Sequence, residues 1–360
     1  MKGMYDLVVY YIIQDFMNKK YRIGAVGYFG DENTAINGQT IRSRMIMKEI
    51  IEIYSTDKVK IISYHRWRKE PIRTLFKYLY ILLNSDIVII FPDANAIKVL
   101  LPLTVLIQRF IRYRSSYNVI GGWITEFLIK NRRYIKYMKK LDNVFVQTNQ
   151  LKVNLEKLGI DNITVFPNFK SYGNYDLNED KFNPPYKLVF FSRVTPQKGI
   201  NEAIDVVSQL NNDGYKYMLD IYGPIDKKFK NEFLQYVNEN SKYCIYKGEI
   251  EPTQVPDILS KYFLQLFPTK FSTEGFPGSV LDSFYSGLPV IASNWDSAYE
   301  VITEGETGFI FDFNNFDMMK RLLIDIYNNP DLVLEMRNKC VRESKKFDPK
   351  KIIKIMVEKL

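Results

Sequence analysis

The run EGFPGSVLDSFYSGLPV, residues 274–290, decides the fold class of this 360-residue chain. Its Pro-Gly turn leads into a short helix with Ser279 as the expected N-cap, and its LPV end begins a buried strand. Acids lie on either side of the helix start, at Glu274 and Asp282. A turn, helix and strand in this order place carboxylates and free backbone amides at the carboxyl edge of a parallel sheet, where open α/β folds bind ligands.

The two acids differ in how well a purely structural role explains them. Asp282 takes the third helical position, where a capping-box acid stabilises a helix start. Glu274 lies outside the helix in a glycine-rich turn, and the free amides of residues 275–278 beside it suit a polar ligand. An ordinary exposed loop glutamate is the alternative for Glu274.

A second loop carries two cations at the end of an expected central strand. KLVFFS (187–192) has the composition of a buried strand, and apolar residues recur at helical spacing from Ile200 onwards. Arg193 and Lys198 lie between the two, where they would clamp a diphosphate, although two solvated loop charges fit the same pattern. Cations at a helix N-terminus oppose its dipole, so an anionic ligand is the simpler reason for their placement.

Short β-rich runs alternate with helical spacings along the chain, which predicts two doubly wound α/β domains. We expect strands of a first sheet at 22–26, 59–62, 86–91, 117–122 and 143–148, and of a second at 187–192, 217–223, 263–268, 289–293 and 308–311. The Asn-, Pro- and Tyr-rich segment 165–186 is typical of a hinge. The N-terminal domain is expected over 1–168, completed by a C-terminal helix at about 346–360, and the C-terminal domain over 169–345.

The loop after the first strand, GYFGDENTAINGQT, is rich in glycine and leads into a helix. Gly38 lies near the helix start, and Arg42 and Arg44 add positive charge to its first turns. Free amides at such a helix start suit an anion. An ordinary strand-to-helix turn fits equally well, because the spacing matches neither a dinucleotide fingerprint nor a Walker motif.

Positive charge is unevenly distributed in this chain, whose formal net charge is +9. Residues 58–140 contain 17 Lys and Arg against four acids. Within them, the segment 98–114 combines large aliphatic residues with Arg109, Arg112 and Arg114, as a helix on an anionic membrane surface does. A core helix with a solvated basic face is the alternative. No nucleic-acid-binding motif accompanies the charge, so we expect no nucleic-acid partner.

Simple counts exclude several other classes of protein. No apolar run approaches the roughly 18 residues of a membrane span, and the first 20 residues lack the basic region and cleavage site of a signal peptide. Cys244 and Cys340 are the only cysteines, and there is one histidine, so neither a disulfide framework nor a zinc cluster is expected. We expect a reduced cytoplasmic protein without a metal or other cofactor.

Taken together, these motifs resemble glycosyltransferase family 4, the retaining GT-B enzymes also known as glycosyl transferases group 1. Four elements carry the resemblance in family order: INGQT around Gly38, SRVTPQKG with Arg193 and Lys198, the acids Glu274 and Asp282 followed by GLPVIAS, and SAYEVITEGETGFIF. The resemblance is strongest from about residue 187 to residue 311. It implies two Rossmann-like domains that face each other across a cleft.

By this resemblance the C-terminal domain binds a nucleotide-sugar donor, with a UDP-sugar favoured over a GDP-sugar. Arg193 and Lys198 would neutralise the leaving diphosphate without a metal. Glu274 would contact the donor sugar and stabilise an oxocarbenium-like transition state, and Asp282, where the family usually has Glu, would bind the ribose. The implied catalytic residues are Glu274, Arg193 and Lys198, and the implied donor-binding set is Arg193, Lys198, Glu274, Gly275, Phe276, Pro277, Gly278, Asp282 and Gly38.

The chain departs from the family in the N-terminal domain. Many members have a His at a strand end near the donor sugar, whereas the matching segment here is GGWITEF, residues 121–127. The only histidine, His65, lies in the basic segment and is not expected to act in catalysis. Glu126 is either a substitute carboxylate or a helix-start residue, and we favour the second interpretation.

The GGW variant resembles the subgroup that builds capsular or exopolysaccharide repeat units on a lipid diphosphate carrier. This implies a cytoplasmic enzyme, peripheral on the inner face of the plasma membrane, which transfers a sugar to a lipid-linked glycan acceptor. Two alternatives share the fold. A nucleotide-sugar epimerase would release an epimerised sugar without an acceptor, and a non-catalytic nucleotide-sugar-binding subunit of a transferase complex would tolerate Glu274→Gln.

Overall fold

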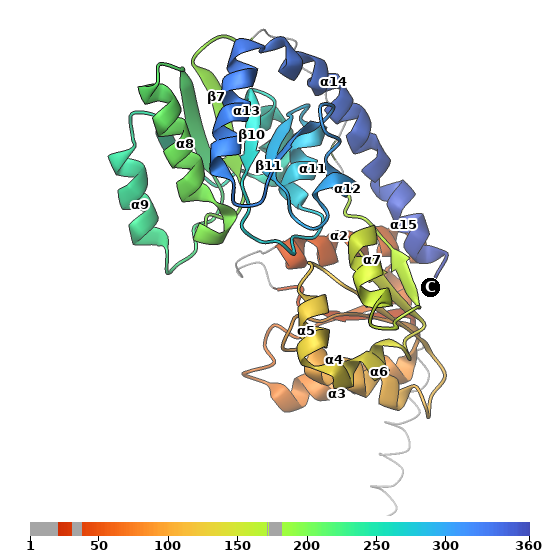
Figure 1. Cartoon of the computed structure of the whole chain (residues 1–360). Helices are drawn as coiled ribbons and strands as arrows, with labels where there is room; N and C mark the ends of the chain where they lie inside the picture. The colour runs from red at the N-terminus through yellow and green to blue at the C-terminus, as the bar shows by residue number, and fades with distance from the viewer. Residues whose placement is uncertain (1–20, 31–37, 171, 173–181) are drawn as a thin grey trace, which may run out of the picture. The chain divides into compact units, whose positions relative to one another are not determined.

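The computed structural model describes residues 21–30, 38–170, 172 and 182–360 of the chain. These residues form two compact units, each built on one six-stranded parallel sheet with helices packed against it (Figure 1). The first unit comprises the described residues up to Pro167 together with Pro349–Leu360, and the second lies within Asn168–Asp348. Residues 31–37 of the expected glycine loop, the first 20 residues, and residues 171 and 173–181 of the expected hinge lie outside the described residues.

The first unit has the strand order β2-β1-β3-β4-β5-β6. Its strands are β1 (Tyr21–Gly27), β2 (Val59–Ser63), β3 (Ser85–Phe91), β4 (Arg114–Asn118), β5 (Asn143–Val146) and β6 (Ile163–Val165). Its helices are α2 (Gly38–Tyr54), α3 (Pro71–Asn84), α4 (Ile97–Ile107), α5 (Ile124–Lys130), α6 (Ile135–Met138), α7 (Asn149–Glu156) and α15 (Pro349–Val357). Side chains of α3, α4, α5 and α7 share one core, and α2 packs beside α15.

The second unit has the strand order β12-β11-β10-β7-β8-β9. Its strands are β7 (Tyr186–Phe191), β8 (Tyr217–Tyr222), β9 (Cys244–Gly248), β10 (Leu264–Phe267), β11 (Val290–Ser293) and β12 (Gly308–Phe311). Its helices are α8 (Ile200–Asn212), α9 (Lys230–Glu239), α10 (Val255–Leu259), α11 (Gly278–Tyr285), α12 (Ala298–Val301), α13 (Phe316–Asn328) and α14 (Asp331–Ser344). One core joins α8 and α13, and a separate one joins α11 with Cys340 of α14, so the sheet is covered on both faces.

The hydrophobic pattern explains the centre of the second sheet. β7 is buried almost continuously from Leu188 onwards, as expected for a parallel strand covered on both faces. The apolar positions of α8 that recur at helical spacing, from Ile200 to Val207, are all buried against the core. The predicted α/β fold class is therefore confirmed.

Three strands differ from the sequence prediction. The fourth strand spans 114–118 rather than 117–122, because the chain turns at Gly121, where φ is +84°. Its sequence RSSYN is polar, and buried serines and an asparagine take positions where an apolar pattern is expected. β6 and β9 were not predicted, since both are short strands at a sheet edge, with only three and five residues.

The basic segment 98–114 is not one helix, contrary to the prediction. α4 ends at Ile107, and Arg114 is the first residue of β4. The Arg114 guanidinium donates a hydrogen bond to the carbonyl of Lys359 at 3.1 Å, which ties β4 to the C-terminal segment of the same unit. Within the described ranges, no helix combines the length and the apolar character that a membrane crossing requires.

Candidate active site

The candidate site of the second unit lies at the carboxyl ends of β7 and β10, which are neighbours in the sheet. In the sheet, β7 lies between β8, the next strand in sequence, and β10. The strand order therefore reverses between β7 and β10, and the loops after these two strands lie at a topological switch point. Open α/β sheets bind their ligands at such points. The loop after β7 carries Arg193 and Lys198, and the loop after β10 carries Glu274.

Gly199 brings these two loops into close contact. It has a φ of +73°, and a Cβ added there would lie 1.9 Å from the carbonyl oxygen of Pro268. The Lys270 amide also donates a hydrogen bond to the carbonyl of Gln197 at 2.8 Å. Only glycine combines this backbone conformation with this approach. The sequence Lys-Gly therefore places the lysine at the loop that follows β10.

Lys198 and Glu274 form an ion pair at this contact. Lys198 Nζ lies 2.5 Å from Glu274 Oε2, and their side chains are 15% and 19% exposed. The Thr269 hydroxyl donates to the same carboxylate oxygen at 3.2 Å, and the Lys198 ammonium lies 5.1 Å from the centre of the Phe267 ring. Glu274 Oε1 has no hydrogen-bond partner among the residues that the structure describes, so one carboxylate oxygen is available to a ligand.

Backbone donors adjoin this carboxylate. In the part of the chain that the structure describes, the amides of Gly275 and Phe276 donate to no acceptor. α11 begins at Gly278, and no side chain caps its N-terminus. The Phe276 ring is buried against Phe347, with ring centres 4.8 Å apart, so Phe276 presents only its backbone to a ligand. A helix start with unused amides attracts anions and ligand hydroxyls.

The start of α11 differs from the prediction. Pro277 rather than Ser279 is the N-cap residue, and Asp282 is the fifth residue of the helix rather than the third. The capping-box interpretation of Asp282 is therefore wrong. Its side chain is only 3% exposed, and both of its carboxylate oxygens lie 2.5 Å from Lys170 Nζ.

Tyr172 completes the surroundings of Asp282. Its hydroxyl donates to the Asp282 carboxylate, and its ring packs edge-on against Tyr285 with centres 5.4 Å apart. Burial, with the adjacent Asp282 charge, raises the pKa of the Tyr172 hydroxyl well above its usual value. A buried carboxylate is stable only when it is paired and hydrogen-bonded, and this pair meets both requirements.

The remaining predicted cations have different surroundings. Arg193 is exposed and has no hydrogen-bond or ion-pair partner among the described residues, so it is available to a ligand. Arg42 is buried and donates to the carbonyls of Phe166 and Pro167 at 2.8 and 3.0 Å. Burial lowers the pKa of the Arg42 guanidinium to about 9. Arg42 therefore holds the end of the first unit's sheet, and the expectation that it adds charge to an anion site is wrong.

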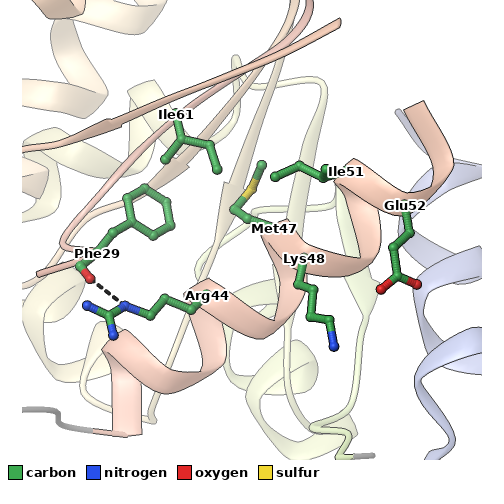
Figure 2. A pocket seen from close by; sticks show the side chains of 7 residues that line it. All are labelled: Phe29, Arg44, Met47, Lys48, Ile51, Glu52 and Ile61. Atoms are coloured by element: carbon green, nitrogen blue, oxygen red, sulfur yellow. Dashed lines mark hydrogen bonds between the residues drawn. The ribbon is translucent and has the colours of Figure 1, made fainter. Parts of the chain in front are cut away.

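Arg44 also forms a hydrogen bond within the first unit. Its Nε donates to the carbonyl of Phe29 at 2.6 Å, at the rim of a small hollow between α2 and β2 (Figure 2). Apolar side chains such as Met47 and Ile61 form most of its wall, as Figure 2 shows. Gly38 is the exposed first residue of α2, and a Cβ there would meet nothing within 4 Å. Packing among the described residues therefore does not require glycine at position 38.

The GGW segment of the first unit is held by hydrogen bonds. The Gly121 amide donates to Gln147 Oε1 at 2.9 Å, and Trp123 Nε1 donates to the carbonyl of Ile120 at 3.0 Å. Glu126 lies in the first turn of α5, exposed, 3.5 Å from Lys130 Nζ. This position agrees with the helix-start interpretation of Glu126.

Sequence reasoning missed two lysines near the site. Lys170 belongs to the segment that the sequence predicts as a hinge. Nothing in the residues next to it in sequence indicates that its partner is Asp282 in α11. Lys270 follows β10 and forms an ion pair of 2.5 Å with Glu202, in the first turn of α8. The sequence contains a signal that could have identified Lys270, because this lysine follows a buried strand and therefore lies at the same sheet edge as Lys198.

The described residues contain no group of three or more His, Cys, Asp or Glu side chains placed to share a metal ion. Both cysteines are buried, and burial raises the pKa of the Cys244 thiol to about 12. Charged side chains in and beside the loops after β7 and β10 are those of Arg193, the Lys198–Glu274 pair and the Lys270–Glu202 pair, and Asp282 of α11 pairs with Lys170.

Residues 174–347 match the family model Glycosyl transferases group 1. An uncharacterised 41.2 kDa protein of the Klebsiella pneumoniae cps region is 24% identical over 199 residues, which cover 55% of this chain and 51% of that protein. The capsular polysaccharide biosynthesis glycosyltransferase CapM of Staphylococcus aureus is 23% identical over 152 residues, 42% of this chain and 39% of CapM. The chain spans about half the length of the first curated relatives it matches.

Solved structures resemble the chain over nearly its whole length. Sucrose-phosphate synthase from Thermosynechococcus elongatus has a TM-score of 0.73 at 13% identity, covering 94% of this chain and 98% of that one. Anabaena HepE in complex with UDP has a TM-score of 0.72 at 14% identity, with the same coverage. At such identities the likeness establishes the fold. The chain has the GT-B fold, and residues 174–347, just under half of its length, match the Glycosyl transferases group 1 model.

Proposed function

We propose that this protein is a retaining glycosyltransferase that uses a nucleotide-diphosphate sugar, preferably a UDP-sugar. The observation that carries the proposal is the Lys198–Glu274 ion pair at the β7–β10 switch point, beside the unused amides of Gly275 and Phe276. A cation, a carboxylate and free amides together match the chemistry of a sugar diphosphate. The family match supports the glycosyl-transfer part of the proposal.

The proposed reaction uses the ion pair in two ways. As the donor binds, the Lys198 ammonium turns from Glu274 to the diphosphate, and Arg193 adds a second cation from the exposed side of the loop. These two charges stabilise the leaving diphosphate as the glycosidic bond breaks, and we propose that no metal is needed. Glu274, released from Lys198, accepts hydrogen bonds from donor-sugar hydroxyls and stabilises the developing positive charge on the sugar.

The other predicted donor contacts follow from the same loop. The backbone from Gly275 to Gly278 supplies amides at the start of α11. Ribose binding by Asp282 requires an exchange, because Lys170 holds both carboxylate oxygens. We propose that ribose hydroxyls replace Lys170 at one of these oxygens. Retention would give an α-linked product from an α-linked donor sugar, as proton NMR of the product can establish.

We further propose that the acceptor is a lipid-diphosphate-linked glycan of bacterial surface polysaccharide synthesis, reached from the cytoplasmic side of the membrane. Exposed apolar side chains on α3, on α4 and in the turn after α4 support a membrane contact, among them Phe76 at 67%, Val99 at 59% and Phe110 at 79% exposure. The two helices are neighbours, since the Tyr78 hydroxyl of α3 donates to the carbonyl of Leu100 in α4 at 3.0 Å. Exposed cations flank the apolar residues, including Arg109 and Arg112.

The donor proposal predicts a ligand-dependent rise in thermal stability. At a ligand concentration 100 times the dissociation constant, binding stabilises the folded state by about 2.7 kcal/mol. A panel of UDP- and GDP-sugars should therefore raise the melting temperature, with a UDP-sugar giving the largest shift. If no nucleotide sugar in the panel shifts the melting temperature, the donor assignment fails. Release of an epimerised free sugar without an acceptor would favour an epimerase instead.

The membrane proposal predicts that the double substitution Arg109→Ser/Arg112→Ser weakens binding to anionic vesicles about 30-fold, because each cation near such a surface contributes about 1 kcal/mol. Arg114 is left intact because it anchors β4. The matched control is Lys48→Ser/Lys157→Ser, which removes two exposed cations of the same unit, one in α2, which packs beside α15, and one just after α7. Vesicle sedimentation measures the effect. Equal binding of the two double variants would contradict the membrane contact.

A further inference from the structure

A second hollow of the first unit, with a volume of about 680 Å³, lies between the edge strand β2 and α3. Lys60, Ser63, His65, Arg73, Phe76, Lys77 and Tyr80 line it, together with Ile61 and Ile62. We call it the β2–α3 cavity. Three of these side chains are permanently cationic, and none of the lining residues is an acid.

The charge of the β2–α3 cavity is only partly balanced by the described residues around it. Arg73 Nη1 lies 2.9 Å from Glu70 Oε2, outside the cavity wall. Lys77 has no ion-pair or hydrogen-bond partner within the described ranges, and Lys60 contacts only the face of the Tyr21 ring, at 5.9 Å. Like charges gathered around a hollow repel one another, so the arrangement is most stable with an anion between them.

An apolar surface continues from one wall of this cavity. Phe76 belongs to the wall and is two-thirds exposed, and Ile72 and Leu75 of the same helix are also exposed. The cavity therefore offers cations inside and an apolar surface at its rim. A soluble phosphate uses only the first of these features, whereas the phosphate end of a lipid uses both, because its chain remains with the apolar residues.

We propose that the β2–α3 cavity binds the terminal phosphate of an anionic lipid, with Lys60 and Lys77 as its principal ligands and Arg73 in support. Arg73 lies in the first turn of α3, where the helix dipole also favours an anion. This inference rests on the proposed membrane contact and deepens it. The surface around Arg109 and Arg112 recognises negative charge in general, whereas the cavity recognises a phosphate that ends the headgroup.

The test compares two anionic lipids of different headgroup. Phosphatidic acid ends in a phosphate monoester. In phosphatidylglycerol the phosphate is a diester, and a glycerol group follows it. With vesicles adjusted to equal surface potential, the wild-type protein should bind those with phosphatidic acid about 10-fold more tightly, a difference of about 1.4 kcal/mol. Lys60→Ser/Lys77→Ser should abolish this preference, and Lys140→Ser/Lys157→Ser, which removes equal charge outside the cavity, should retain it.

Two results would overturn the inference. One is a wild-type protein without preference between the lipids, and the other is a preference that survives Lys60→Ser/Lys77→Ser. Calorimetric titration of inorganic diphosphate distinguishes a lipid headgroup from a soluble phosphate as the ligand. Tight diphosphate binding that requires Lys60 and Lys77, without any preference between the lipids, would assign the cavity to a soluble ligand. UDP titration of the wild type and of Lys60→Ser/Lys77→Ser separates failure of this inference from failure of the proposed function. If both proteins bind UDP but the lipid test fails, only the role of the cavity is refuted. If the wild type does not bind UDP, the donor proposal is refuted.

Discussion

Glu274→Gln should lower the rate of sugar transfer about 100- to 1,000-fold, the usual effect of removing one electrostatic stabiliser of a transition state. The amide keeps the size of the side chain but has no charge to balance the oxocarbenium-like sugar. It can accept a hydrogen bond from Lys198 but cannot replace the ion pair, in which the two side chains lie 2.5 Å apart in the unliganded protein. The measurement is initial rate with a UDP-sugar and a lipid-linked acceptor at saturating donor concentration. Nucleotide binding should change far less than the rate, since Lys198 and Arg193 remain.

The matched control is Glu232→Gln, an exposed acid in the first turn of α9, far along the chain from the loops after β7 and β10. It should leave the rate within about twofold, as expected for a surface substitution without a structural partner. A Glu274→Gln protein that transfers sugar at the wild-type rate would exclude Glu274 from catalysis. It would also favour the interpretation of the chain as a non-catalytic nucleotide-sugar-binding subunit.

Gly199→Ala should destabilise the second unit by about 3 kcal/mol and abolish donor binding, because a Cβ at this position collides with backbone and is held at positive φ. The added carbon would lie 1.9 Å from the Pro268 carbonyl oxygen, and a backbone atom cannot rotate away as a flexible side chain does. The loop that carries Lys198 must therefore separate from the loop that carries Glu274. Urea denaturation and UDP titration measure the two effects.

Gly214→Ala is the control that separates the steric clash with Pro268 from the free-energy cost of placing alanine at a positive φ. Gly214 also has a positive φ, +95°, but a Cβ there meets nothing within 4 Å. Its substitution should cost about 1 kcal/mol, the strain of a left-handed conformation alone, and should leave donor binding unchanged. If the two alanine variants are equally stable and both bind donor normally, the close approach at Gly199 does not hold the site together.

The sequence was informative where chemistry and hydrophobic pattern coincide. β12 is apolar throughout and β7 is apolar except for Lys187, so both strands were predicted within a residue or two. The loops that follow buried parallel strands meet at one sheet edge, which is why Arg193, Lys198 and Glu274 were recognised as candidates before their positions were known. The Lys-Gly pair at 198–199 also has a local cause, because only glycine fits against Pro268.

Contacts between distant segments were not predictable in the same way. Asp282 looked like a helix-capping acid because its neighbours in sequence allow that role, whereas its actual partner, Lys170, lies 112 residues earlier. Arg42 looked like a solvent-facing charge at a helix start, but its guanidinium reaches carbonyls 124 and 125 residues later. β4 was misplaced because buried Ser115, Ser116 and Asn118 reverse the usual apolar pattern of a central strand. In each case tertiary contacts determined what the local pattern left open.

The most direct test of the central claim, that the loops after β7 and β10 hold a nucleotide sugar, is calorimetric titration of UDP into three proteins. The wild type should bind, and Arg193→Ser/Lys198→Ser should bind at least about 100-fold more weakly, because two charge-assisted contacts are lost. Lys216→Ser/Lys247→Ser, which removes two exposed lysines elsewhere on the second unit, should bind as the wild type does. Equal affinity of all three proteins, or no binding of UDP by the wild type, would contradict the account.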